Sequence, residues 1–203
     1  MIKRFAATDV IEGFQNYVFW KTFAINDLRA KYRRSKLGQF WITLSVAAFI
    51  LVVGTLYRGI FKADQHTYLA YLSVGYILWL LISDVMVAGC SIFTANKAFL
   101  LQGRMPASVF AYRLVLRETL TFAHHIVILP FIFLYLQLWP GIGGILLSCL
   151  GFLLVIYCAF WLALILGIVS LRFRDMPPIV TSLSRLAFFA TPIFWIERDL
   201  ELP

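Results

Sequence analysis

Residues 119–171 decide the fold: TLTFAHHIVILPFIFLYLQLWPGIGGILLSCLGFLLVIYCAFWLALILGIVSL, a run without any Lys, Arg, Asp or Glu. One transmembrane helix needs about 20 apolar residues, so this run is long enough for two. Its middle, residues 138–144 (LWPGIGG), combines a turn signal with an aromatic residue typical of membrane interfaces. We therefore divide it into spans near 119–138 and 145–170.

Three further apolar segments have a length suited to spans. They are residues 37–57, residues 68–93, which are interrupted only by Asp84, and residues 179–196, which contain Arg185. The sequence therefore predicts an all-α, polytopic helical membrane protein with about five visible transmembrane helices. Residues 37–203 would form the transmembrane domain, and residues 1–36 a cytoplasmic or interfacial segment.

The composition excludes the soluble classes. Of the 203 residues, 62% are hydrophobic and 14% are charged, whereas a soluble domain has about 25% charged residues. The three cysteines lie in apolar runs, where a cysteine is usually a small buried hydrophobe rather than a redox group.

The net charge of +8 predicts topology rather than nucleic-acid binding. Basic residues gather in residues 1–36, in the loop after the second span (Lys97, Arg104, Arg113, Arg117) and after the fourth span (Arg172, Arg174). Because basic loops stay in the cytoplasm, we expect a multi-pass protein with a cytoplasmic N-terminus.

Residues 1–36 predict an amphipathic helix. Ile11, Val18, Ile25 and Tyr32 recur every seven residues, with early Lys and Arg nearby. We expect this helix to lie along the membrane surface. The alternative is a cytoplasmic helix that packs on the protein itself.

Several polar residues lie in or beside the predicted spans. No phosphate-binding loop is present, so we expect no nucleotide hydrolysis by this chain and no cofactor. The adjacent His124 and His125 point about 100° apart on a helix, which does not suit a shared metal. Asp84 needs a charge partner, for which Arg185 is the obvious candidate. A polar stripe at helical spacing marks either a solvated helix end or a substrate-facing surface: Arg113, Arg117, Thr121 and His124.

Several short segments carry a family resemblance. They are residues 27–41 (DLRAKYRRSKLGQFW), 104–106 (RMP), 122–125 (FAHH), 172–176 (RFRDM) and 191–195 (TPIFW). In order and spacing they resemble permease subunits of polysaccharide-exporting ABC transporters. The similarity is greatest to the O-antigen and related cell-surface-polysaccharide branch.

The resemblance implies a division of labour. Two copies of the chain would form the path in the bacterial inner membrane, and separate ATP-binding subunits, carrying ATP and Mg²⁺, would drive export. A loop near residues 94–106 would hold a short helix that docks on the ATPase. Its candidate docking residues are Lys97, Phe99, Leu100, Leu101 and Arg104.

The implied cargo is a lipid-pyrophosphate-linked glycan. Basic residues suit the pyrophosphate, because guanidinium groups bind phosphate oxygens, although lipid headgroups would attract the N-terminal ones equally well. Aromatic side chains, 17% of the chain, would line the glycan path. The candidate path residues are Lys31, Arg33, Arg34, Arg113, Arg117, Phe40, Trp41, Tyr76, Trp79, Asp84, Arg185, Phe188, Phe189 and Trp195.

Two alternatives remain at this stage: an ABC permease for another cargo, such as teichoic acid or a drug, and an integral-membrane enzyme acting on lipid-linked sugars. The enzyme would need an acid–base set, for which only Asp84, Glu118 and the two histidines are available. Family members usually continue for about one quarter more chain, with a sixth span, so we expect residues 1–203 to be incomplete.

Overall fold

The computed structural model describes residues 2–33, 40–61, 65–102 and 105–193. Within these ranges the chain is helical, without β-strands. The helices are α1 (Ile2–Gln15), α2 (Tyr17–Tyr32), α3 (Phe40–Phe61), α4 (Gln65–Gly89), α5 (Lys97–Leu101), α6 (Ser108–Ile126), α7 (Ile128–Leu136), α8 (Ile142–Arg172) and α9 (Met176–Ala190).

Three stretches of the described chain are long and apolar enough to cross a membrane: Tyr68–Gly89, Ser108–Leu136 and Ile142–Arg172. They confirm the all-α, polytopic membrane class. α3 and α9 lie where the first and fifth spans were expected, but α9 has 15 residues and residues 194–196 lie outside the described ranges. Five spans therefore stay a prediction.

The third span begins earlier than predicted. Its helix starts at Ser108 rather than near residue 119, so Arg113 and Arg117 lie on α6 and not in a loop. The helix is interrupted at Val127, and the same span continues as α7 from the next residue, Ile128. Pro130 explains the interruption, because a proline ring clashes with the carbonyl of the residue four positions earlier, here Ile126.

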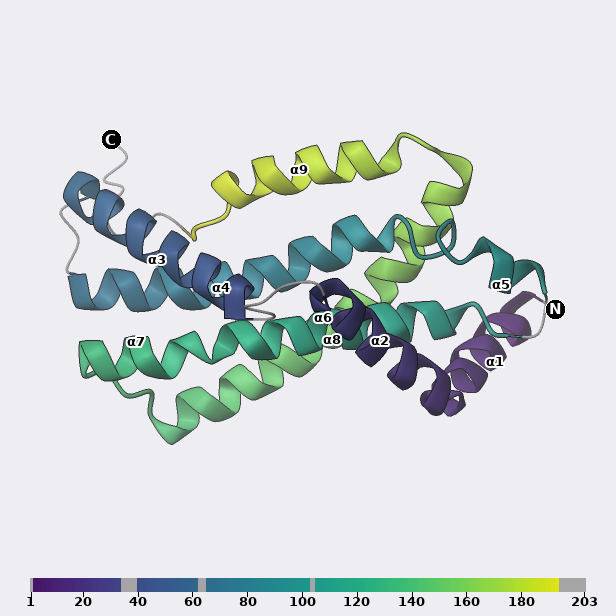
Figure 1. Cartoon of the computed structure of the whole chain (residues 1–203), viewed down its shortest axis with the longest axis horizontal. Helices are drawn as coiled ribbons and strands as arrows, with labels where there is room; N and C mark the ends of the chain where they lie inside the picture. The colour runs from purple at the N-terminus through teal and green to yellow at the C-terminus, as the bar shows by residue number, and fades with distance from the viewer. Residues whose placement is uncertain (1, 34–39, 62–64, 103–104, 194–203) are drawn as a thin grey trace.

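α4 is the central helix of the bundle (Figure 1). It packs against α3, α6, α7, α8 and α9. Small residues bring α4 and α8 together: a Cβ on Gly89 would lie 3.2 Å from the Cα of Ala163, and one on Gly167 would lie 2.7 Å from Ile92. Close backbone approach through small residues is typical of membrane helices, which have no hydrophobic driving force between them.

The N-terminal segment forms two helices rather than one. They meet at Asn16, whose side-chain Nδ2 donates to the carbonyl oxygen of Glu12 at 2.8 Å. α2 packs on α6 with Leu28 buried, as in the alternative interpretation, whereas Phe14 and Val18 are more than 60% exposed. Of the seven-residue pattern, Ile11 and Val18 are thus exposed, while Leu28, outside the pattern, packs on the protein.

The segments predicted to be cytoplasmic lie toward the same end of the molecule. α1, α5 and the turn between α8 and α9 are at the right of Figure 1, and the turn between α7 and α8 is at the left. This arrangement agrees with basic residues gathering on one side of a membrane.

Candidate functional site: a polar junction between α2, α4, α5 and α6

Arg113 on α6 joins three parts of the chain. Its Nε and Nη2 donate to the two carboxylate oxygens of Asp27 on α2, both at 2.7 Å, and its Nη1 donates to Asn96 Oδ1 at 3.0 Å. The guanidinium also lies 5.2 Å from the ring centroid of Phe23. Forked Arg–carboxylate pairs are among the strong, orientation-specific hydrogen bonds. We name Asp27, Asn96 and Arg113 the arginine junction.

Asn96 is held in position by the end of the preceding segment. Its Nδ2 donates to the carbonyl oxygen of Ile92 at 2.7 Å, which leaves Oδ1 directed at Arg113. Asn96 is also the residue before α5, and its carbonyl oxygen accepts from the backbone N–H groups of Phe99 and Leu100. The arginine junction therefore reaches the first turn of α5.

α5 is the short helix expected at this place in the chain. Phe99 packs edge-on against Phe19 and Phe23 of α2, with ring centroids 6.3 and 6.1 Å apart. Leu100 is partly buried against the core, whereas Leu101 is 76% exposed and Lys97 is also exposed. Of the candidate docking residues, Leu101 and Lys97 thus face outward and Arg104 lies outside the described residues.

A second contact fixes α1 to the start of α6. The carboxylate of Asp9 accepts from the backbone N–H groups of Ala107 and Ser108 at 2.8 and 2.9 Å, and Ser108 Oγ donates to the Asp9 carbonyl at 2.6 Å. Gly13 permits this approach, because a Cβ there would lie 2.0 Å from Ser108 Oγ. Free N–H groups at a helix start are satisfied by such a carboxylate, here from a distant helix.

Four charged residues also lie within electrostatic reach of one another on α2, α4 and α6. Arg117 Nε donates to Glu118 Oε1 at 2.7 Å, and the Glu118 side chain is only 6% exposed. Asp84 on α4 lies within electrostatic reach of Glu118, Lys31 and Arg117. We name these four residues the charged cluster; it contains two cations and two carboxylates, so its formal charge is balanced.

The expected Asp84–Arg185 pair is wrong. No ion pair joins these two described residues, and both are exposed in the single chain. The neighbouring Ser83 and Ser184 make the contact between α4 and α9 instead, with their Oγ atoms 2.7 Å apart. Successive helical residues are about 100° apart, so Asp84 is turned from α9 toward the charges of α6 and α2.

The predicted polar stripe of α6 is largely bonded within the chain. Besides the two arginines, Thr121 Oγ1 donates to the Arg117 carbonyl at 3.1 Å and His124 Nδ1 lies 2.7 Å from the Leu120 carbonyl oxygen. His125 is buried, and its Nε2 has no hydrogen-bond partner. The described residues hold no group of three or more His, Cys, Asp or Glu positioned for a metal ion.

Several predicted aromatic residues come together between α4 and α9. Phe188 lies 5.8 Å from both Tyr76 and Trp79, and Phe189 packs beside Phe188 at 5.6 Å. Phe49 of α3, which sequence reasoning missed, stacks on Tyr76 at 4.2 Å. Other candidates are separate or not placed: Phe40 and Trp41 are exposed at the start of α3, and Arg34 and Trp195 lie outside the described residues.

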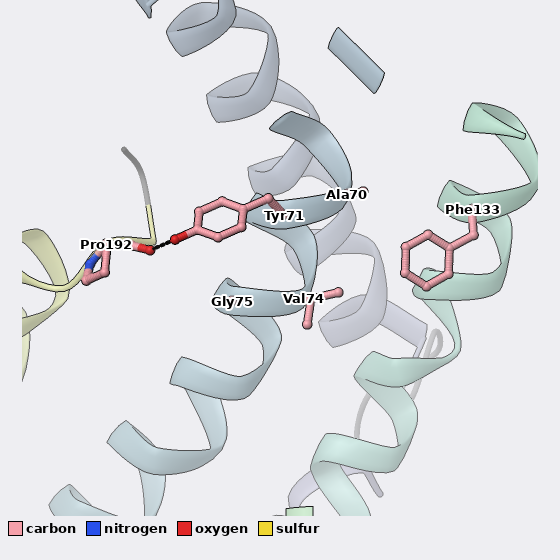
Figure 2. Close-up of a pocket in the computed structure, with 6 residues that line it drawn as sticks. All are labelled: Ala70, Tyr71, Val74, Gly75, Phe133 and Pro192. Carbon is pink, nitrogen blue, oxygen red and sulfur yellow. Dashed lines mark hydrogen bonds between the residues drawn. The ribbon is translucent and has the colours of Figure 1, made fainter. Parts of the chain in front are cut away.

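A shallow apolar pocket of about 400 Å³ opens on α4 (Figure 2). It is lined by Ala70, Tyr71, Val74, Gly75, Phe133 and Pro192. The Tyr71 hydroxyl donates to the Pro192 carbonyl and bridges α4 to the end of α9. Gly75 is nine residues from Asp84, about 14 Å along the helix, so the pocket is separate from the charged cluster.

Sequence reasoning missed Asp9, Asp27 and Asn96 as members of the site. Asp27 stands as an acid in an otherwise basic stretch, residues 27–36, and this was the available signal. Lys31 and Arg33, predicted from the same stretch, are exposed at the end of α2. Nothing in the sequence indicates the partners of Asp9 and Asp27, which lie 86 to 99 residues further along the chain.

Membrane-length apolar helices, a basic end and a partly buried ion pair between α2 and α6 define a polytopic helical membrane protein. No family model matches the chain. It is 28% identical over 171 residues to the O-antigen export system permease protein RfbA of Myxococcus xanthus. Two proteins of that name from Klebsiella pneumoniae are 26% and 25% identical over 173 residues.

Each alignment covers 83% of this chain and 65% of the relative, so the chain spans less than two thirds of the length of these relatives. The three alignments confirm the resemblance to O-antigen export permeases that the short segments indicated.

Proposed function

We propose that this chain is the membrane-embedded permease subunit of an ABC transporter that exports a lipid-linked cell-surface polysaccharide of the O-antigen type. The similarity over 83% of the chain to three O-antigen export permeases carries this proposal. The helical, membrane-length architecture supports it. The chain acts in the bacterial inner membrane as a homodimer, and its N-terminus, α5 and the α8–α9 turn face the cytoplasm.

ATP and Mg²⁺ bind to a separate ATPase subunit, which docks on α5. The exposure of Leu101 at the end of the molecule supports this docking site, since an exposed apolar side chain on a short helix fits a groove in a partner. Phe99 is 38% exposed and also packs against α2, where it anchors the helix.

The lipid-pyrophosphate end of the cargo would meet basic residues near the end of α2, and the sugars would meet aromatic faces. The exposure of Arg33 and the gathering of Tyr76, Trp79 and Phe188 support these roles. Arg113 is a weaker candidate for binding the pyrophosphate than the sequence indicated, because its Nε and Nη2 already donate to the Asp27 carboxylate.

Deletion of the gene in its host tests the proposal. We expect surface polysaccharide to disappear and lipid-linked polysaccharide to accumulate inside the cell, measured by surface labelling and by extraction of the lipid-linked pool. The intact gene should restore both, but not in a strain whose ATPase partner carries an inactivated phosphate-binding lysine. Unchanged surface polysaccharide in the deletion strain would refute the function.

The docking site has its own test. Leu101→Asp should reduce co-purification of the ATPase at least tenfold, because it places a charge in an apolar contact. Thr94→Asp, which adds the same charge at an exposed position before α5, is the matched control and should leave co-purification unchanged. Equal recovery with both variants would remove α5 from the docking site.

A further inference from the structure

α2 contacts α5 near its start, and near its end it carries Lys31, its member of the charged cluster. Phe19 and Phe23 meet Phe99 of α5, Asp27 binds Arg113, and Lys31 lies within electrostatic reach of Asp84. These positions follow one another along a single helix of 16 residues, about 24 Å long. α2 therefore spans the distance between α5 and the charged part of α4 and α6.

An ion pair crosses between α2 and α6 at this point. The Arg113–Asp27 pair joins residues 86 apart in sequence, with side chains 19% and 25% exposed. The Arg117–Glu118 pair joins adjacent residues of α6 and connects no other element. The same guanidinium of Arg113 also holds Asn96, the residue that precedes α5.

From this geometry we propose that Arg113 is a positioning residue for energy coupling: it fastens α5 to α2, so that a displacement of α5 moves α2 and, through it, the surroundings of the charged cluster. This inference rests on the proposed function, in which an ATPase acts on α5. Coupling requires packed or hydrogen-bonded elements that shift together. The arginine junction and the Phe19–Phe23–Phe99 contact supply such a connection.

The connection does not follow the covalent chain. α5 is joined to α4 through residues 90–96, and α2 lies about 70 residues earlier in the sequence. If Arg113 were only a pyrophosphate contact, its loss would reduce cargo binding and leave α5 and α2 joined. If it fastens the two helices, its loss should separate their movements while both helices remain folded.

The first experiment needs no ATPase. Hydrogen exchange of the purified chain in lipid nanodiscs should show at least tenfold faster exchange for the amides of residues 97–101 in Asp27→Asn and Arg113→Gln. The exchanged-charge double variant Asp27→Arg/Arg113→Asp should return the rate toward wild type. Arg117→Gln removes the local pair of α6 and should leave these amides unchanged. Unchanged exchange in Asp27→Asn would overturn the proposal.

The second experiment uses the complex with its ATPase, reconstituted in proteoliposomes. Asp27→Asn should keep ATPase binding and hydrolysis within twofold of wild type and lower polysaccharide export per ATP at least tenfold, and the double variant should restore this ratio. An unchanged ratio, or loss of ATPase binding in Asp27→Asn, would overturn the coupling role. If the wild-type chain binds no ATPase and exports nothing, the proposed function fails while the exchange result still decides whether Arg113 fastens α5.

Discussion

α6 and the first half of α8 have opposite relations to the rest of the molecule. α6 carries Arg113, Arg117 and Glu118, yet ten of its residues are buried. α8 has no charged residue in residues 142–158, and none of these residues is buried in the single chain. In a membrane, apolar side chains can face lipid without cost, whereas polar side chains need partners in the protein. Of these two segments, the one that carries charged side chains is therefore the one that packs inside the protein.

The largest loss of stability is expected when a glycine in the packed half of α8 is replaced by a large residue. Gly167→Leu should destabilise the fold by about 3 kcal/mol, because its Cβ alone would lie 2.7 to 2.9 Å from Ile92 and Phe93. Unfolding in detergent micelles measures the change. Gly151→Leu in the exposed half is the matched control, since a Cβ there meets nothing within 4 Å, and it should not destabilise. Equal losses of stability in the two variants would contradict the difference in packing between the two halves of α8.

A smaller loss of stability is expected when one leucine of α6 or one leucine in the first half of α8 is replaced by alanine. Leu114→Ala in α6 removes a side chain that is 4% exposed and should cost about 2 kcal/mol, the low end of the range for buried leucines. Leu147→Ala in α8 removes one that is 72% exposed and should cost less than about 0.5 kcal/mol. The same unfolding measurement compares them, and a larger loss for Leu147 would show that α8 is covered in the purified state.

The smallest effect concerns the contact between α1 and α6. Asp9→Ala removes the acceptor of two backbone N–H groups and should cost about 1 kcal/mol, the value typical of lost helix caps. Glu12→Ala, an exposed acid on the same helix, is the control and should be neutral. Limited proteolysis should release α1 faster only in the Asp9 variant. Identical release rates would show that Asp9 does not hold α1.

The membrane class could be predicted because charge-free runs are a direct signal, but the start of α6 could not. Arg113 and Arg117 read as loop charges, since an unpaired arginine at that depth would be costly. Their actual partners, Asp27 and Glu118, remove that cost. One partner is 86 residues away, and no local pattern indicates a contact at such a separation.

The candidate site could be predicted where it depends on spacing within one helix. Tyr76 and Trp79, three residues apart on α4, share a face and both meet Phe188. The Asp84–Arg185 pair required a correct rotation of two helices about their axes, which the hydrophobic pattern did not determine. Ser83 and Ser184, weak signals in the sequence, face each other instead.

The cap that Asp9 places on α6 has a consequence for biogenesis. The cap joins residues 98 and 99 positions apart, so α1 is synthesised long before the backbone it will bind. At about 5–20 residues per second, the ribosome needs roughly 5–20 s to make the intervening chain. During that interval the Asp9 carboxylate lacks both of its backbone N–H partners, and Asp27 lacks Arg113. The contacts of α1 and α2 with α6 can therefore form only after residues 107–113 have been synthesised.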